Sequence, residues 1–196
     1  MSSSIHLCES IFSAGDLESF LDFVTEFCIN RSLLDDSMEI DHVCYRVETV
    51  HEYTRITNEL STYGDVIADS MINGRPITTV KLNQPMKYKN WSISCIEIPC
   101  PKAGRPYQAG WEHIEIVIGD QHMGCLNNKS ILETFMSKYS EIEFDTRAID
   151  KEINADVSIE IGQYSCKFHC RPLYEVCEFE RKHGHDVPVP SDYFSD

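Results

Sequence analysis

The feature that most constrains the fold is a pair of histidines in near-identical surroundings. His42 and His113 lie 71 residues apart; each follows an acidic residue, precedes an aliphatic residue and opens a strand-like run. Glu97 and His169 lie 72 residues apart, and each also belongs to a strand-like run. Four residues of metal-ligating type, repeated at nearly one offset, predict two copies of one structural unit that share a metal ion.

The order of predicted elements repeats in the same way. Hydrophobic periodicity in the first half predicts a strand, a helix and three strands, over residues 40–47, 49–63, 65–72, 76–82 and 90–98. Gly64 marks the expected end of this helix, and Asn73-Gly74 predicts a hairpin turn. A Pro- and Gly-rich stretch follows at 99–110. The second half repeats the order over residues 112–118, 128–139, 143–149, 155–161 and 164–171.

These patterns predict an α+β fold in which paired βαβββ units form a curled mixed sheet around a cup. The units span roughly residues 38–98 and 111–171, within a domain of residues 38–182 that ends in a helix at 173–182. An N-terminal helical extension over 1–37, with its helix within 16–34, and a loose tail over 183–196 complete the predicted organisation.

The net charge of −15 argues against binding to nucleic acid or to an anionic membrane, because both are polyanions. No apolar run approaches the roughly 20 residues of a membrane-spanning helix, and the N-terminus lacks the pattern of a secretory signal. The nine cysteines are therefore expected to be reduced thiols in a cytoplasmic protein. We expect a monomer or homodimer whose partner is a small-molecule substrate or ligand.

Strand alternation places His42, Cys44 and Arg46 on one face, and it places His113 with Glu115. Three imidazoles and one carboxylate suit a divalent transition metal ion with open coordination positions, namely Zn, Ni, Co, Fe or Mn. The predicted ligands are His42, Glu97, His113 and His169. His169 can instead orient a ligand, with Glu115 or Glu160 in its place. The alternative for all four is a set of half-buried strand residues held by hydrogen bonds.

Other residues carry further hypotheses. Glu115 is the candidate catalytic base if it is not a ligand, and Arg46 is the candidate group for binding an anionic substrate. Arg75 and Arg105 are candidates for the same role or for ties between a loop and a carboxylate. Trp111 either walls the cup or fills the core. A closed zinc site of Cys166, His169 and Cys170, with His183 or His185 as fourth ligand, is disfavoured because neighbouring positions on a strand face opposite sides.

Several longer motifs resemble a known family. The sequences MINGRPI at 71–77, IEIP at 96–99, GRPY at 104–107, GWEHIE at 110–115 and KFH at 167–169 closely resemble the YecM family, over about residues 41–175. That family is similar to the vicinal oxygen chelate superfamily, which includes glyoxalase I, extradiol dioxygenases and methylmalonyl-CoA epimerase. The resemblance implies paired βαβββ units around one divalent metal ion, without an established reaction. Cys170 stands where the family usually has proline, and Cys44 where a small serine-like residue is common.

Three functions remain open at this point. The first is a metal-dependent enzyme acting on a small oxygen-rich substrate, as an isomerase, lyase or oxygenase. The second is a non-catalytic protein that binds a small ligand or a metal. The third is an interaction protein whose metal site is vestigial.

Overall fold

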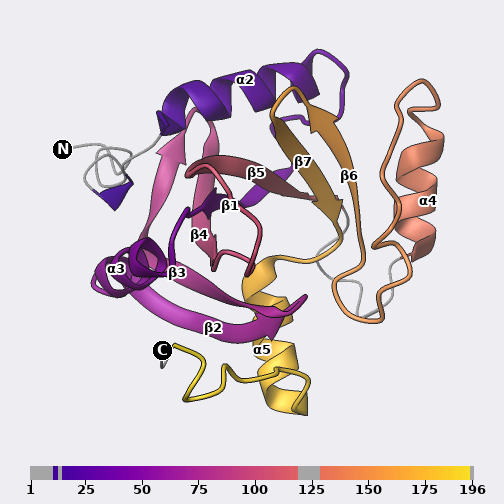
Figure 1. Cartoon of the computed structure of the whole chain (residues 1–196). Helices are drawn as coiled ribbons and strands as arrows, with labels where there is room; N and C mark the ends of the chain where they lie inside the picture. Colours follow the sequence, from indigo (N-terminus) through magenta and orange to yellow (C-terminus); the bar gives the residue numbers. More distant parts are fainter. Residues whose placement is uncertain (1–10, 13–14, 119–128, 195–196) are drawn as a thin grey trace.

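One curled, mixed sheet forms the centre of the computed structural model, which describes residues 11–12, 15–118 and 129–194 (Figure 1). Its strands are β1 (Glu39–Arg46), β2 (Gly64–Ile72), β3 (Arg75–Tyr88), β4 (Trp91–Pro99), β5 (Gly110–Val117), β6 (Asp156–Ile161) and β7 (Tyr164–His169). The seven strands lie in the order β2-β3-β4-β1-β5-β7-β6. The first strands of the two predicted units, β1 and β5, are therefore neighbours at the middle of the sheet.

The two halves are built alike, and the predicted fold class is confirmed. In the first half β1 pairs parallel with β4, and in the second β5 pairs parallel with β7. The two halves join through the antiparallel pairing of β1 with β5. Helix α3 (Val50–Leu60) is the next element after β1, and helix α4 (Lys129–Ser137) is the next described element after β5. Residue 128, the predicted start of the latter helix, lies outside the described residues.

The strand predicted at 143–149 is wrong. This segment makes a single bridge, between Asp145 and Ser158 of β6, at the place where β2 pairs with β3 in the first half. The side chain of Asp145 accepts a hydrogen bond from the backbone N–H of Arg147 at 3.0 Å. Such a side-chain turn competes with strand pairing, so the edge of the second unit is reduced to one contact.

Local chemistry accounts for the ends of the elements. Asp16 caps α2 (Leu17–Ile29) by accepting hydrogen bonds from two backbone N–H groups of its first turn, and Thr49 caps α3 by accepting one, from the backbone N–H of Glu52. Asn73 and Gly74 both have positive φ, 51° and 79°, as a tight hairpin turn requires.

Gly64 comes after the end of α3, as predicted, but position 64 requires glycine for a reason other than ending the helix. It is the first residue of β2, and a Cβ added there would lie 2.2 Å from the carbonyl oxygen of Lys81 on β3. The close approach of the two strands excludes any side chain at this position.

Helices cover both faces of the sheet (Figure 1). The aliphatic face packs against α2, α3 and α4; Phe135 of α4, for example, lies 4.8 Å from Phe168 of β7 between ring centroids. Helix α5 (Leu173–His183) lies by β2 and β3, where Lys81 sits 4.1 Å above the ring of Tyr174. Beyond α5, one bridge joins Pro188 to Ser70 of β2. None of the described helices has the length and apolar character of a membrane-spanning segment.

Candidate metal centre

Two β-bulges between β1 and β5 shape the polar side of the sheet. Asp41 is the unpaired residue of one bulge, just before His42, and Glu112 is the unpaired residue of the other, just before His113. An extra residue in a strand lets two successive side chains reach the same side. Asp41 Oδ2 accordingly lies 2.9 Å from His42 Nδ1, and Glu112 Oε2 lies 3.8 Å from the Sγ of Cys44. The repeated acid–histidine pair in the sequence is thus a repeated bulge in the structure.

Glu115 is the carboxylate at the centre of the cluster. Its Oε1 lies 3.4 Å from the Nε2 atoms of both His42 and His113, and its Oε2 lies 3.8 Å from Nδ1 of His169. The ring of His42 lies 6.1 Å from that of His113 and 6.2 Å from that of His169, between centroids. Only 5% of the Glu115 side chain is exposed, so water does not screen these contacts.

Outer partners fix two of the imidazole rings. Asp41 Oδ2 accepts hydrogen bonds from Nδ1–H of His42 and from the backbone N–H of Leu173 at 2.8 Å, the first residue of α5. The amide oxygen of Asn154 lies 3.2 Å from Nδ1 of His169. Nε2 of His42 then lies toward Glu115, whereas Nε2 of His169 lies 3.4 Å from Oδ2 of Asp41. Both Nε2 atoms are buried without a hydrogen-bond partner. Carboxylate or amide partners on the outer nitrogen are typical of metal-ligating histidines.

The charges in the cluster favour a cation among these atoms. Burial lowers the pKa of His42, but Glu115 and Asp41 outweigh it and raise that pKa to about 10. Burial opposes ionisation of Glu115, yet Lys167 and His42 hold its pKa well below the usual value. Burial lowers the pKa of His169, which keeps its imidazole neutral. A carboxylate that stays ionised beside unpartnered imidazole nitrogens is a suitable set of donors for a divalent ion.

Lys167 lies within the same cluster. Its Nζ is 2.7 Å from Glu115 Oε1 and 3.0 Å from His113 Nε2. Burial lowers the pKa of Lys167, but Glu115 and Glu97 raise it above its usual range, so the side chain is cationic. The sequence pattern did not single out this lysine as part of the site.

The strand register corrects the correspondence between the halves. Lys167 lies opposite Glu115 on β5, as Glu97 lies opposite Cys44 on β1. The counterpart of Glu97 is therefore Lys167, two residues before the predicted His169. Lys167 and His169 lie on the same face of the strand, so strand alternation alone cannot detect an error of two positions.

Three groups of side chains bring ligand atoms within 4.8 Å of one another. They are Asp41 with His42 and His169; His42 with His113 and Glu115; and Cys44 with Glu112 and His113. In the part of the chain that the structure describes, Glu97 belongs to none of these groups. The first two groups share His42, and the second contains the central carboxylate.

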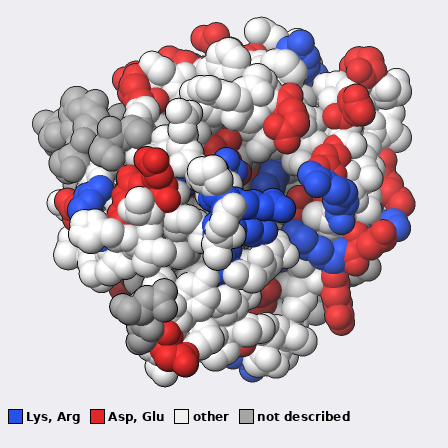
Figure 2. Space-filling view, in the orientation of Figure 1, with Lys and Arg blue, Asp and Glu red and all other residues white. Residues whose placement is uncertain are grey.

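A cavity of about 400 Å³ opens beside the second bulge, with Tyr107 and Glu112 in its lining. Arg46 borders it, but its guanidinium already pairs with Glu112, with 3.1 Å between Nε and Oε2, and stacks 4.7 Å from the ring of Tyr107. Figure 2 shows Lys and Arg side chains gathered around a hollow on one face of this acidic chain. The volume lies in the range of small-molecule sites.

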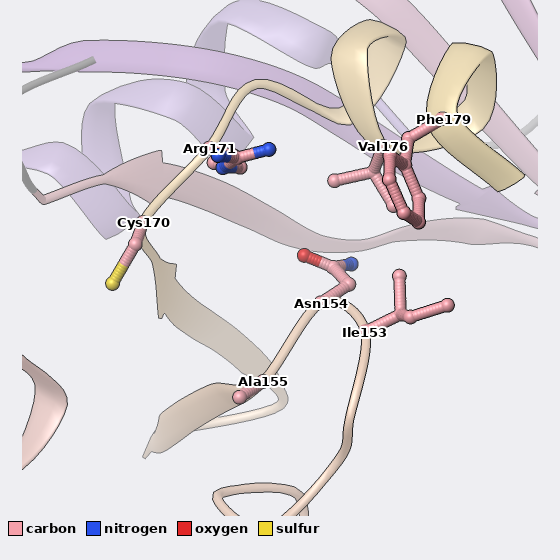
Figure 3. A pocket seen from close by; sticks show the side chains of 7 residues that line it. All are labelled: Ile153, Asn154, Ala155, Cys170, Arg171, Val176 and Phe179. Carbon is pink, nitrogen blue, oxygen red and sulfur yellow. The ribbon is translucent and has the colours of Figure 1, made fainter. Parts of the chain in front are cut away.

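A much smaller cavity of about 10 Å³ lies between Asn154 and helix α5. Figure 3 shows the side chain of Asn154 directed into it, near Val176 and Phe179 of α5. Asn154 has a positive φ of 51°, which asparagine tolerates better than most residues. The cavity has room for about one water molecule, so it serves the placement of Asn154 rather than the binding of a substrate.

The model of the YecM protein family matches residues 11–180. The chain belongs to the YecM family. Protein YecM of Escherichia coli K12 is 33% identical over 173 residues, which cover 86% of this chain and 92% of that protein. An uncharacterised protein of Haemophilus influenzae is 38% identical over 80 residues, covering 41% of this chain and 42% of its own.

A solved structure supports the same assignment. The structure titled "Structural Genomics, Protein EC4020" has a TM-score of 0.64 and 28% identity, over 84% of this YecM-family chain and 89% of that chain. Neither its title nor the names of the two relatives states a reaction. What the chain does must therefore be inferred from its own site.

The remaining predicted residues of this YecM-family chain lie outside the cluster. Arg105 and Glu160 are exposed, and Arg75 donates to the carbonyl of Cys100 at 3.3 Å. Trp111 packs in the core, with its ring 5.1 Å from that of Tyr45 between centroids, and it also lines the cavity beside Glu112.

The alternative zinc site is not assembled among the described residues. Cys166 interacts with Cys28 of α2, and His183 stacks on Phe179 at 4.0 Å. Neither cysteine of that prediction joins a group of ligand atoms with His169. Sequence reasoning also missed Asp41, although its repetition in front of a histidine was a visible signal.

Proposed function

We propose that the chain binds one divalent transition metal ion through His42, His113 and Glu115 and acts as a metal-dependent enzyme on a small oxygen-rich substrate. The observation that carries this proposal is the fully buried Nε2 atom of His42, which has no hydrogen-bond partner and lies 3.4 Å from the ionised carboxylate of Glu115. Nε2 of His169 is likewise buried and unpaired, 3.4 Å from Oδ2 of Asp41. Buried polar atoms are otherwise almost always paired, so such a concentration of unpaired ones indicates a missing ligand.

The chain's own residues would divide the work as follows. Asp41 holds Nδ1 of His42, which directs Nε2 toward Glu115; a bound metal ion would take the place of the proton on this nitrogen. Asn154 holds Nδ1 of His169, whose Nε2 lies 3.4 Å from Asp41, so His169 lies at the edge of the site as a further ligand or as a hydrogen-bond acceptor. A bound metal ion would supply Lewis-acid stabilisation of a developing oxyanion.

The resemblance to the vicinal oxygen chelate superfamily favours an isomerase, lyase or oxygenase reaction. Glu115 is the candidate for moving a proton if it leaves its place as a metal ligand, because its carboxylate lies 3.4 Å from Nε2 of both His42 and His113. Arg46 is the candidate for the far end of the substrate, which would have to compete with Glu112 for its guanidinium. The proposed partner is thus a small molecule, bound within one chain.

Metal content separates the proposal from its alternatives. Protein purified without chelators should carry close to one equivalent of a transition metal by elemental analysis, and His42→Ala with His113→Ala should lose it. The matched control is His51→Ala with His185→Ala, since both of these histidines are exposed. Normal metal content in the His42/His113 variant, or none in the wild type after metal is offered, would sink the metal site and leave a buried polar cluster of structural use only.

A non-catalytic binding protein is the second candidate, supported by the paired state of Arg46 and the closed surroundings of His42. It predicts thermal stabilisation by small hydroxy acids in the metal-loaded protein without any product by mass spectrometry. The identity of the bound metal distinguishes the enzyme classes, because oxygenase chemistry needs Fe²⁺ and is ruled out if the protein selects Zn²⁺, which is redox-inactive.

A further inference from the structure

An ammonium group occupies the space between two of the candidate ligand atoms. Nζ of Lys167 lies 2.7 Å from Oε1 of Glu115 and 3.0 Å from Nε2 of His113, and these two atoms are 3.4 Å apart. A metal ion bound to both would sit about 2.0–2.2 Å from each. The metal ion and the ammonium group therefore cannot occupy these positions together.

Lys167 is also the member of the cluster that reaches solvent. Its side chain is 28% exposed, whereas those of Glu115, His113 and His42 are 5%, 6% and 0% exposed. A ligand that approaches from solvent thus meets the ammonium group before it meets the imidazole nitrogens. That group repels cations and attracts anions.

The repeat in the sheet explains why a cation lies here. The register places Lys167 opposite Glu115 in the second half and Glu97 opposite Cys44 in the first. One half therefore carries a carboxylate and the other an ammonium group at corresponding positions. The side of the cup with Glu97 therefore favours cations, and the side with Lys167 favours anions.

We propose that a divalent metal ion reaches His113 and Glu115 only by displacing the ammonium group of Lys167, which then binds an anionic oxygen of the ligand at the open side of the site. The proposal rests on the proposed metal site and names its ligand class, a small hydroxy or keto carboxylate. The displaced Nζ stays at the open side because β7 fixes its backbone and the inner neighbours His42 and His169 are fully buried. An ammonium group offers three donors, so it can bind a carboxylate oxygen without a fixed orientation.

Metal affinity tests the displacement. Co²⁺ is titrated calorimetrically into chelator-stripped wild type, Lys167→Met, Lys167→Arg and Lys182→Met, the last a control at an exposed lysine of α5. Removing the competing ammonium group should tighten Co²⁺ binding by about tenfold or more, which corresponds to ~1.4 kcal/mol. The Arg and Lys182 variants should bind no more tightly than the wild type.

The outcomes separate the two proposals. If the wild type binds Co²⁺ and folded Lys167→Met binds it equally or more weakly, the displacement is overturned and the metal site stands. If neither binds it, both proposals fall; binding by the Met variant alone supports the displacement. Should Lys167→Met not fold without metal, Lys167→Gln, which can still donate to Glu115, carries the same expectation.

Two isosteric probes test the anion site. Glycolate should raise the melting temperature of the Co²⁺-loaded wild type more than glycolamide, its uncharged counterpart, because only the former carries an anionic oxygen. In Lys167→Met the preference for glycolate should shrink to the part that the Co²⁺ ion itself contributes by binding a carboxylate more tightly than an amide. A full preference for glycolate in that variant overturns the assignment of Lys167 as the anion-binding group, whatever the metal affinities show.

Discussion

Glu115→Gln tests the charge cluster, because the amide keeps the shape of the carboxylate and removes its charge. Oε1 of Glu115 and Nζ of Lys167 are 2.7 Å apart, and their attraction is roughly 6 kcal/mol at an effective dielectric constant of ~20. Lys167 offsets part of the loss in the variant, since its side chain is 28% exposed and can turn toward water. We expect the metal-free protein to lose about 3 kcal/mol of unfolding free energy, as is usual for a broken buried ion pair.

Urea unfolding in the presence of a chelator near pH 7 measures this loss, and calorimetry should show a melting temperature lower by roughly 6–12 °C. The matched control is Glu160→Gln on β6, whose carboxylate is exposed; its effect should stay within about 0.5 kcal/mol. The pKa of Glu115 lies below its unfolded value of 4.5, so its stabilisation is present above that pH and lost as the pH falls through the folded pKa.

A double variant completes the test. Glu115→Gln with Lys167→Met removes both charges of the pair, so it should recover a large part of the stability that Glu115→Gln loses. The reasoning is refuted if Glu115→Gln costs less than about 1 kcal/mol, or if the two single losses simply add in the double variant.

Three further predictions concern single positions. The pKa of His42 is raised to about 10, so the metal-free protein should lose stability as the pH rises from 6.5 toward that value. Urea unfolding at stepped pH measures this slope, which His42→Gln should lack. Equal slopes in the two proteins would contradict the assigned charge. Gly64→Ala should cost roughly 3 kcal/mol in urea unfolding, through its clash with the β3 backbone, against about 1 kcal/mol for Gly74→Ala, where only the positive φ matters. Asn154→Gly keeps the positive φ but loses the contact with His169, so the urea midpoint should report a loss of about 1 kcal/mol; an unchanged midpoint means that only the backbone conformation matters.

Much of the fold follows from local sequence patterns. The helices that follow Asp16 and Thr49, the Asn73-Gly74 turn and the existence of strands β1 and β5 depend on neighbours within a few residues, and all of them are present. The segment at 143–149 has a strand-like composition, but the side chain of Asp145 forms a local turn there instead. An edge strand has one partner at most, so a local hydrogen bond is enough to replace it.

The site was predictable to a smaller extent. Alternation places Glu115 on the side of His113, and the repeat relates His113 to His42; the structure brings these three together. Alternation also assigns Asp41 to the opposite face, because it assumes an unbroken ladder. The bulge at Asp41 breaks that assumption and turns its carboxylate toward His42.

The sequence by itself determined that the chain has two related halves with a histidine at the start of each, because periodicity and spacing can be read directly from the order of residues. Only the tertiary structure decided which side chains meet. The register of β7 against β5 placed Lys167 on Glu115, and the start of α5 brought the N–H of Leu173 to Asp41. Both depend on how strands and helices far apart in the chain pack across one sheet. Such packing is set by the sum of many non-local contacts, and no short stretch of sequence encodes it.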